Sequence, residues 1–406
     1  MIIRQATRKL RGWNFPFRKS KSRLFQVLRC FLLFLLIDGI INGYRFRNYY
    51  YRLALIPDWP ADSLDLRDYI WPMDDTDIII PRGFCEEKTF LLIVIESSVN
   101  NFLRRQDIRE TWGNTSSFNY PVFNKLHEHL RGSYYPPLKS RIQHYAEFLT
   151  GEDDVLRASV RVVFITGRSK DVQYSRPLQM EADRHNDIIQ EGFIDSYNNL
   201  TLKSVMALKH LNNMCSKTTA YVFKADDDTF VNVPNVVHIL LGGTVPVYKV
   251  SKKNPIGHQS RLTATSGLMV GRKRDGEKPI KDMNTKFYMP AYIFPNTTFP
   301  ECLSGGGYLM SMDVVQRLYV AAIRTKIVHM EDVYVTGLCA QRARVIPAHN
   351  SLFRIFPSRN LCTYKDTITL QLPQGVSMHM VWDFVLNFRI KCPLNLKQIY
   401  KFEDYE

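Results

Sequence analysis

The sequence predicts an α/β fold with a largely parallel central sheet, preceded by an N-terminal transmembrane helix. Three short apolar runs rich in β-branched residues, at 90–95, 160–165 and 220–223, are typical of strands buried on both faces. Segments with helix-like spacing separate these runs, and such alternation favours parallel pairing. With 406 residues and 45% apolar content, the chain can bury the core of one large domain or two small ones.

The N-terminal region is first basic and then apolar. Residues 1–29 contain nine basic side chains and no acidic one, which accounts for much of the net charge of +15. The apolar stretch 24–41 has about 18 residues, close to the roughly 20 that a membrane span needs. Because basic residues are more numerous before this stretch than after it, the positive-inside bias keeps the N-terminus cytosolic. We therefore predict a cytosolic tail at 1–23 and a signal-anchor helix at 24–41, with a cleaved signal peptide as the alternative. Since the charge excess belongs to this tail, we expect no nucleic-acid partner.

The cysteines and sequons fit a translocated domain. Six cysteines after the anchor could form up to three disulfides in an oxidising lumen, and their connectivity stays open: Cys85, Cys215, Cys302, Cys339, Cys362 and Cys392. None of them belongs to a C-x-x-C pair, so zinc is not indicated. Three glycosylation sequons agree with this compartment: Asn114, Asn199 and Asn296.

Composition predicts the boundaries of the segments that come after the anchor. Residues 42–85 are rich in Tyr, Arg, Asp and Pro without a sustained period, and we interpret them as a lumenal stem. The main domain then covers 86–395, and 396–406 form a C-terminal tail. Residues 118–158 have no clear place among the strands and helices, so we interpret them as an insertion.

Helices are expected after the first strand and before the third. Residues 104–111 have helix-like spacing. Residues 177–213 suggest two helices joined near Asp195, the first of which includes Ile188 and Ile189.

The strongest chemical signal is the run Asp226-Asp227-Asp228 at the end of the third apolar strand. Ligands of open α/β sheets bind at the carboxyl ends of strands. A bound cation would relieve the repulsion among these carboxylates, and hard oxygen ligands suit Mg²⁺ or Mn²⁺ shared with substrate phosphates. We expect Asp226 and Asp228 to hold the metal, while Asp227 points away or binds the donor sugar or ribose. The alternative is a solvated acidic turn; a calcium EF-hand is disfavoured because Val231 occupies the position of its turn glycine.

Three further motifs could carry chemistry. At Glu331-Asp332 a carboxylate with a raised pKa could act as general base, although Asp332 could simply cap a helix. The glycine run 305–307 allows backbone to approach a ligand closely. Arg105 and Arg109 could bind a diphosphate or uridine, or could lie on a solvated helix face.

In their order along the chain, these motifs resemble the β-1,3-glycosyltransferase family (glycosyltransferase family 31), which includes β-1,3-galactosyl- and β-1,3-N-acetylglucosaminyltransferases. The resemblance runs from about residue 90 to residue 382 and rests on these segments: 102–113, 164–167, Glu181 with 187–189, 193–203, 224–232, 304–308, 331–334 and 362–364. It implies a GT-A-like nucleotide-sugar-binding fold, single-pass type II Golgi topology, a UDP-sugar donor, Mn²⁺ and inversion at the anomeric carbon.

The resemblance also implies roles for individual residues. Asp226 and Asp228 correspond to the metal-binding carboxylates, and Asp332 to the catalytic base with Glu331 beside it. Donor-side positions are implied for Arg105, Arg109, Asp187 and Lys203.

The expected function is transfer of a hexose or N-acetylhexosamine, galactose favoured, to the 3-hydroxyl of a glycan on a glycoprotein or glycolipid. A membrane-embedded enzyme of this kind could form a homo- or hetero-oligomer. The alternative is a catalytically weak lumenal sugar-binding protein or a partner of another transferase.

This chain departs from the family pattern in three places. Gln371 stands where the family often has a metal-binding His, Leu303 is an extra residue between Cys302 and Ser304, and 118–158 is additional. The first departure bears on the affinity for the metal. The other two mean that the family does not identify the acceptor of this chain.

Overall fold

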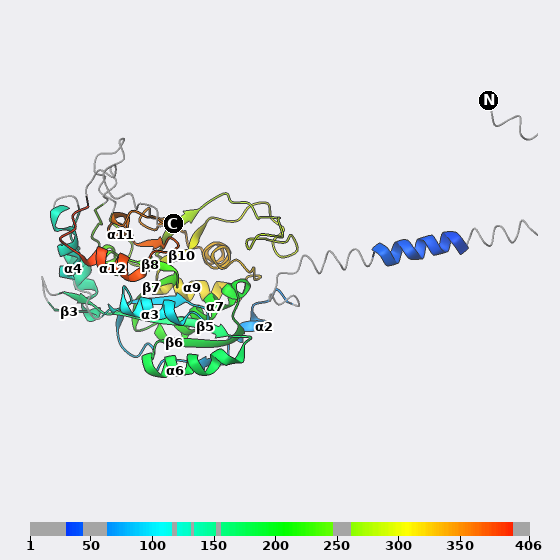
Figure 1. The fold of residues 1–406 in the computed structure, drawn as a ribbon, viewed down its shortest axis with the longest axis horizontal. Helices are drawn as coiled ribbons and strands as arrows, with labels where there is room; N and C mark the ends of the chain where they lie inside the picture. The colour runs from blue at the N-terminus through cyan, green and yellow to red at the C-terminus, as the bar shows by residue number, and fades with distance from the viewer. Residues whose placement is uncertain are drawn as a thin grey trace, which may run out of the picture. The chain divides into compact units, whose positions relative to one another are not determined.

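The computed structural model describes residues 30–43, 63–115, 120–130, 134–151, 156–246 and 261–392. The chain divides into two units, Met1–Leu55 and Ile56–Glu406. In the first unit residues 30–43 form a helix, coloured blue in Figure 1. Of the predicted anchor, residues 24–29 lie outside the described residues, as do the tails predicted at 1–23 and 396–406. Among the described helices, none has both the length and the apolarity required to cross a membrane.

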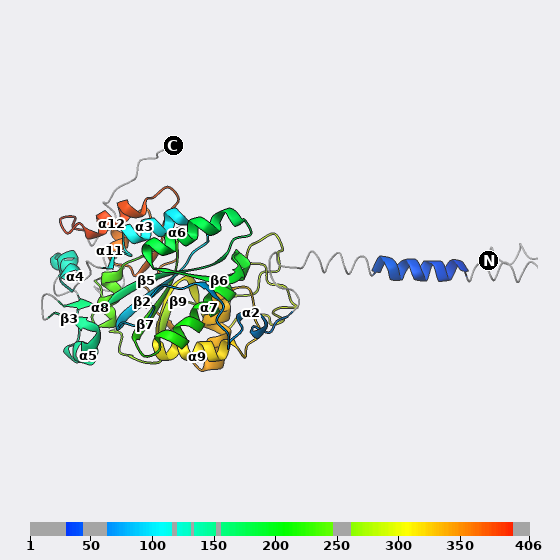
Figure 2. The same ribbon diagram turned by 90° about the horizontal axis from the view of Figure 1, so that it is seen from below.

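An eight-stranded sheet is the centre of the second unit (Figures 1 and 2), in the order β1-β6-β5-β2-β7-β10-β9-β11. The bounds of its strands are β1 Asp77–Ile79, β2 Thr89–Glu96, β5 Val160–Arg168, β6 Ile188–Ile194, β7 Thr219–Asp226, β9 Met269–Arg274, β10 Cys302–Ser311 and β11 Ala348–His349. The four central strands β6, β5, β2 and β7 run parallel, whereas β10 is antiparallel to both β7 and β9. The prediction of an α/β fold with a largely parallel sheet is confirmed.

Two small sheets accompany the large one: β3 Leu149–Thr150 with β4 Arg157–Ala158, and β8 Thr229–Val231 with β12 Thr369–Gln371. The α-helices are α2 Arg67–Ile70, α3 Phe102–Glu110, α4 Tyr120–His127, α5 Lys139–His144, α6 Ser175–His185, α7 Leu200–His210, α8 Val233–Leu240, α9 Met312–Ala322, α10 Ala340–Ala343, α11 Cys362–Lys365 and α12 Met378–Leu386. Single turns of 3₁₀ helix include η6 Tyr197–Asn199, and π-helical segments follow α7 and precede α10 at η7 Leu211–Cys215 and η8 Val333–Cys339.

Helices cover both faces of the large sheet (Figure 2). Successive side chains of a strand point to opposite faces, and in β2 both sets are apolar. Leu92 and Val94 join the cluster that includes residues of α7 and α9, whereas Ile93 and Ile95 join the cluster with residues of α3, α6, α8 and α12. Burial on both faces explains why this strand reads as an unbroken apolar run.

The predicted strands and the first predicted helix are confirmed, but one assignment was wrong. The three apolar runs form β2, β5 and β7, and the helix expected at 104–111 is α3. Ile188 and Ile189, which we had placed in a helix, begin strand β6 beside Phe164 and Ile165 of β5. The physical reason is Asn186, whose left-handed φ of 52° ends α6 just before this β-branched pair.

Part of the predicted stem belongs to the folded unit. The region 63–85 contains α2 and strand β1, which pairs with β6, and a disulfide joins Cys85 to Cys215. Leu66, the N-cap residue of α2, and Ile70, its last residue, are buried in the core, because their i, i+4 spacing places both on one side. Residues 44–62 lie outside the described residues.

The predicted insertion packs against one helix of the domain. Of the range 118–158, residues 118–119, 131–133 and 152–155 lie outside the described residues. In the described part, Phe123 and Leu126 of α4 are buried in the cluster that contains α8. The backbone N–H of Leu138 donates to Leu241 just after α8, at 2.9 Å.

Two disulfides form rather than three. The second joins Cys362 to Cys392, and Cys302 and Cys339 remain as buried thiols.

Candidate active site

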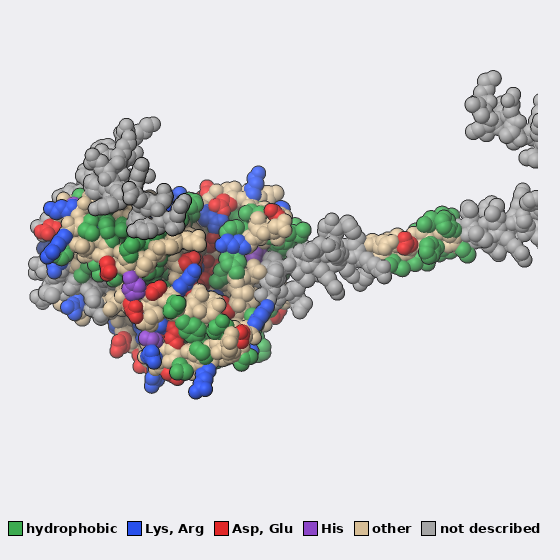
Figure 3. Space-filling view, in the orientation of Figure 1, with side chains coloured by type: hydrophobic (Ala, Val, Ile, Leu, Met, Phe, Trp, Pro, Cys, Tyr) green, Lys and Arg blue, Asp and Glu red, His purple; other side chains and the backbone are tan. Residues whose placement is uncertain are grey.

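A cavity of about 820 Å³ opens at the carboxyl ends of the parallel strands β2 and β7. The acidic side chains that line it are Glu96, Asp195, Asp226, Asp227, Asp228, Glu277 and Asp332. The basic side chains that line it are Lys203, Arg274, Lys278, Lys286 and Arg354. On the face shown in Figure 3, acidic and basic side chains of the described residues are interspersed.

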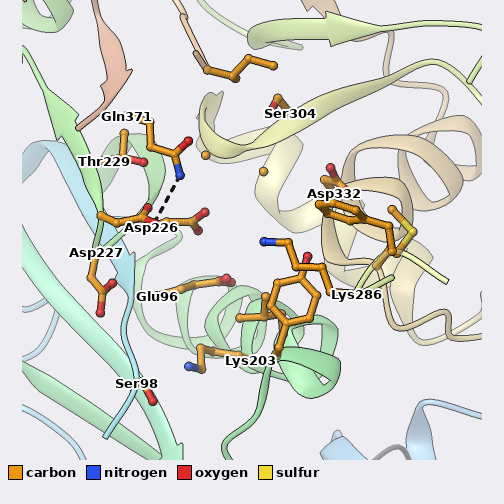
Figure 4. Close-up of a pocket in the computed structure, with 18 of the residues that line it drawn as sticks. Glu96, Ser98, Lys203, Asp226, Asp227, Thr229, Lys286, Ser304, Asp332 and Gln371 are labelled. Atoms are coloured by element: carbon orange, nitrogen blue, oxygen red, sulfur yellow. Dashed lines mark hydrogen bonds between the residues drawn. The ribbon is translucent and has the colours of Figure 1, made fainter. Parts of the chain in front are cut away.

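The three consecutive aspartates do not act alike. Asp226 ends β7, and Asp227 and Asp228 form the turn to β8. The side chains of Asp226 and Asp228 are 38% and 41% exposed, but that of Asp227 is only 8% exposed. Asp227 points away from its neighbours in Figure 4 and accepts hydrogen bonds from Ser97 Oγ at 2.8 Å, Asn101 Nδ2 at 2.7 Å and Arg104 Nη1 at 2.9 Å. Asp227 therefore anchors the turn, which leaves Asp226 and Asp228 to face the cavity.

The oxygen donors at this end of the cavity fit part of a cation site. Gln371, the last residue of β12, donates from Nε2 to Asp228 Oδ2 at 3.3 Å. Burial, together with the charge of Asp226, raises the pKa of Asp228. Within the described residues, no group of three or more His, Cys, Asp or Glu could hold a metal ion. The two carboxylates suit a hard divalent cation that takes its remaining ligands from substrate phosphates and water.

A buried lysine joins this end of the cavity to the other. Lys224 lies two residues before Asp226, so both side chains leave β7 on the same face. Its Nζ contacts four oxygens: Asp226 Oδ1 at 2.7 Å, the Gly305 carbonyl at 2.8 Å, Glu96 Oε2 at 3.2 Å and Glu331 Oε2 at 3.3 Å. Burial acts to lower the pKa of Lys224, but the surrounding carboxylates outweigh it and raise that pKa well above its usual value. The ammonium group is thus a fixed positive charge under the cavity.

Glu331 and Asp332 occupy different environments. Glu331 is buried, accepts a hydrogen bond from the Tyr308 hydroxyl at 2.6 Å, and has a pKa raised by burial to about 8. Asp332 lines the cavity, accepts from the backbone N–H of Val333 at 2.8 Å and pairs with Arg274. Burial raises the pKa of Asp332 while Arg274 opposes that rise. Asp332 is therefore both a helix cap and the carboxylate that faces the cavity.

The glycine run is a bulge in β10. Leu303 pairs with Lys273 and Tyr308 with Gly271, so the residues between them on β10 have no counterparts on β9. A Cβ on Gly305 would lie 3.1 Å from Glu331 Oε2, and one on Gly307 would lie 2.8 Å from Thr369 Cγ2. The absence of side chains lets β10 approach the Glu331 carboxylate.

The arginines predicted to bind the donor lie elsewhere. Arg105 is completely buried and bonds to Glu181, Ser97 Oγ and the carbonyls of Ser98 and Val99. The Arg109 guanidinium pairs with Glu181 and, through two bonds of 2.7 and 2.8 Å, with Asp187. None of Arg105, Arg109 and Asp187 lines the cavity. Instead, both arginines pair with Glu181, and Arg109 also pairs with Asp187.

Lys203 is the one member of that predicted donor set which reaches the cavity wall. Its Nζ lies 2.7 Å from Asp195 Oδ1 and 2.7 Å from the Ser97 carbonyl oxygen, and its side chain is 2% exposed. Lys203 therefore positions the loop after β2 more than it offers charge to a ligand.

One predicted glycosylation site is excluded by burial. Asn114 and Asn296 are exposed. Asn199 is 4% exposed and donates from its side-chain nitrogen to the Ile194 carbonyl at 2.8 Å. The folded protein has no room for a glycan on that nitrogen.

Sequence reasoning gave no role to Glu96, Lys224, Arg274 or Lys286. The spacing of Lys224 from Asp226 on a predicted strand was a usable signal. Glu96 directly ends an apolar strand, as Asp226 does, and could have been noticed by the same rule. Arg274 and Lys286 are brought to the cavity only by tertiary structure, and no local pattern marks them.

Comparison with known proteins gives a consistent family. The galactosyltransferase family model matches residues 103–351. Beta-1,3-galactosyltransferase 1 of Homo sapiens is 31% identical over 301 residues, which cover 74% of this chain and 75% of that protein. Lactosylceramide 1,3-N-acetyl-beta-D-glucosaminyltransferase of Xenopus tropicalis is 28% identical over 357 residues, covering 83% and 78%. N-acetyllactosaminide beta-1,3-N-acetylglucosaminyltransferase 2 of Mus musculus is 27% identical over 317 residues, covering 76% and 66%.

Proposed function

The chain belongs to the galactosyltransferase family and is a β-1,3-glycosyltransferase, and from this premise we propose that it is a UDP-sugar-dependent, inverting enzyme. It transfers a hexose or N-acetylhexosamine, galactose favoured, to the 3-hydroxyl of a glycan on a glycoprotein or glycolipid. The observation that carries the proposal is one cavity that Asp226, Asp228 and Asp332 all line, and Figure 4 shows Asp226 and Asp332 in it. The cavity thus has a carboxylate pair for the donor side and a separate carboxylate for the acceptor hydroxyl.

Asp332 is the general base of this proposal. The acceptor 3-hydroxyl oxygen forms a bond to the anomeric carbon, and its proton passes to Asp332. The bond from that carbon to the β-phosphate oxygen breaks, and its electron pair leaves with UDP. Because burial raises the pKa of Asp332, this carboxylate is a better proton acceptor than an exposed aspartate, and the Arg274 guanidinium beside it favours the ionised form at neutral pH. A single displacement inverts the anomeric centre.

Asp226 and Asp228 would hold a divalent cation such as Mn²⁺, with Gln371 beside them. When bound, the cation supplies positive charge to the leaving diphosphate. Lys224 orients Asp226 by binding Oδ1, and the hydrogen bonds to Asp227 hold the turn that carries Asp228.

The test is product formation by the purified full chain. UDP-galactose, UDP-N-acetylglucosamine and UDP-N-acetylgalactosamine are offered with a small panel of glycan acceptors, with and without MnCl₂, and product analysis reads the linkage. Asp332→Asn should reduce turnover about 10²- to 10⁴-fold, the usual contribution of a general base. Asp228→Asn should remove the response to Mn²⁺, and the exposed Asp107→Asn is the matched control. Full activity of Asp332→Asn would contradict the base, and full activity of Asp228→Asn would contradict the cation site.

Gln371 favours a second candidate, a sugar-binding protein with weak or no turnover. Its amide nitrogen donates to Asp228, so in this arrangement it adds no ligand to the cation site. Tight UDP binding without product from any of the three donors would support this candidate. The variant Gln371→His restores the family's usual residue and should raise Mn²⁺ affinity in calorimetry; an unchanged affinity would separate Gln371 from the metal.

We also propose that the enzyme is a single-pass type II protein of the Golgi membrane with its second unit in the lumen. The two disulfides and the exposed Asn114 and Asn296 support an oxidising, glycosylating compartment. Protease protection of the second unit in sealed Golgi vesicles tests this topology, and digestion without detergent would contradict it.

A further inference from the structure

The cavity wall contains two lysines that pair with no carboxylate among the described residues. Of the basic side chains that line it, Lys203 pairs with Asp195, Arg274 with Glu277 and Asp332, and Arg354 with Asp366. In the part of the chain that the structure describes, Lys278 and Lys286 form no ion pair with a carboxylate. These two lysines are therefore the cations of the wall that remain available to an anionic ligand.

Lys286 is held in position, whereas Lys278 is not. Lys286 belongs to the long connection between β9 and β10, and its Nζ lies 5.1 Å from the ring centre of Tyr197 and 5.0 Å from that of Phe287. Cation–π contacts of this kind fix an ammonium group without neutralising it. Tyr197 comes from η6 and also lines the cavity, so this contact joins two cavity-lining segments that lie far apart in the sequence.

The direction of the side chain selects the ligand. In Figure 4 the Lys286 side chain enters the cavity between Asp332 and Asp226, with its ammonium group turned toward Asp226. On the proposed function, the donor diphosphate lies at Asp226 and Asp228, and the acceptor hydroxyl lies at Asp332. A cation between them faces the β-phosphate, which is the group that carries new negative charge as the anomeric bond breaks.

We propose that Lys286 binds the β-phosphate of the UDP-sugar and stabilises the departing UDP. This inference rests on the proposed function and adds a second positive charge to the donor site, supplied by the protein. This charge matters most in a chain in which Gln371 replaces the family's metal-binding His, because the divalent cation then has two carboxylates as its protein ligands. No proton or covalent bond is exchanged with Lys286: the ammonium remains charged while the electron pair of the broken bond passes to the phosphate oxygen.

Calorimetric titration of the full chain with UDP and UMP, in the presence of MnCl₂, tests the proposal. A charge-assisted hydrogen bond is worth about 1.5–3 kcal/mol, so Lys286→Met should weaken UDP binding about 10- to 100-fold. UMP lacks the β-phosphate, and its affinity should change less than about threefold on the same energy scale. Lys286→Arg, which keeps the charge, should recover part of the loss. Lys326→Met is the control, because Lys326 is an exposed lysine that does not line the cavity, and this variant should bind UDP as the unmodified chain does.

The outcomes separate the two hypotheses. If the unmodified chain binds UDP and Lys286→Met binds it equally well, the proposal for Lys286 is overturned. If only the KM for the acceptor rises in that variant, Lys286 contacts the acceptor instead of the donor. An equal loss of UDP and UMP affinity would also overturn it, because the contact would then not be specific to the β-phosphate. If the unmodified chain binds neither nucleotide, the proposed function fails first. The thermal midpoint of Lys286→Met should match that of the unmodified chain because the side chain is exposed.

Discussion

Arg105 offers a sharp test of the difference between a donor ligand and a structural ion pair. Replacement by Met removes five hydrogen bonds, two to the Glu181 carboxylate at 2.9 and 2.7 Å and three to Ser97 Oγ, the Ser98 carbonyl and the Val99 carbonyl. Removing one partner of a buried ion pair costs about 3–5 kcal/mol. Arg109 still contacts Glu181, so we expect the lower end of that range. At about 2–4 °C per kcal/mol, the thermal midpoint should fall by roughly 6–12 °C.

The assay pairs thermal unfolding with donor kinetics. Arg105→Met should lower the midpoint, and Arg105→Lys should lower it less because the charge remains while the planar fork is lost. The double variant Arg105→Met with Glu181→Met should recover part of the loss, since no buried carboxylate is then left without its arginine. A normal midpoint combined with a tenfold rise in the KM for the UDP-sugar would refute the structural role and restore Arg105 to the donor site.

Three other predictions address packing, pH and glycosylation. Gly307→Ala should destabilise the fold by about 1–3 kcal/mol, because its Cβ would lie 2.8 Å from Thr369 Cγ2. Gly306→Ala is the control and should be tolerated, because the atom nearest to its Cβ would be 3.7 Å away. Equal thermal midpoints of the two variants would contradict this prediction. Burial lowers the pKa of His127 and of His238 to about 3 from an ordinary 6.5. Between these two pH values the unfolded chain binds protons at these histidines and the folded chain does not, so the free energy of unfolding falls as the pH drops from 6.5 toward 3. At pH 5 each histidine should cost about 2 kcal/mol, and His127→Gln should reduce the fall in midpoint between pH 7.5 and pH 5; an unaltered fall would show that its pKa is not depressed. Asn114→Gln and Asn296→Gln should each remove one glycan from the protein expressed through the secretory pathway, which gel electrophoresis shows as faster migration. A change of migration for Asn199→Gln would contradict the burial of Asn199.

Local pattern was enough to predict the strands that build the site. An unbroken apolar run predicts a strand buried on both faces, and β2, β5 and β7 satisfy it because helices cover both sides of the sheet. Since the carboxyl ends of such strands meet at one edge, the position of Asp226 to Asp228 followed as well. The same reasoning failed at Ile188 and Ile189, where apolar spacing alone could not distinguish a helix end from a short strand.

Charge partners were not predictable in the same way. A basic residue close to a ligand-binding strand end looks identical in the sequence whether its charge is free or neutralised. Arg105 and Arg109 were expected to bind the donor because they lie near a strand end and match donor-side positions of the family, but Glu181 and Asp187, more than 70 residues away, pair with them. Lys286 was overlooked, although in the described part of the chain it lacks such a partner. Whether a cation binds substrate or holds the fold depends on contacts that only the tertiary structure supplies.

The environment of Lys224 explains why three motifs spread over about a hundred residues of the sequence belong to one site. Its ammonium group contacts Asp226 from the aspartate run, the carbonyl of Gly305 from the glycine bulge, and Glu331 from the acidic pair. The bulge is needed because a side chain at Gly305 would occupy the space beside the Glu331 carboxylate. Asp226 at the donor end and Glu331 beside the base thus bind the same buried ammonium group. The two ends of the cavity are therefore joined by contacts to a residue that does not line it.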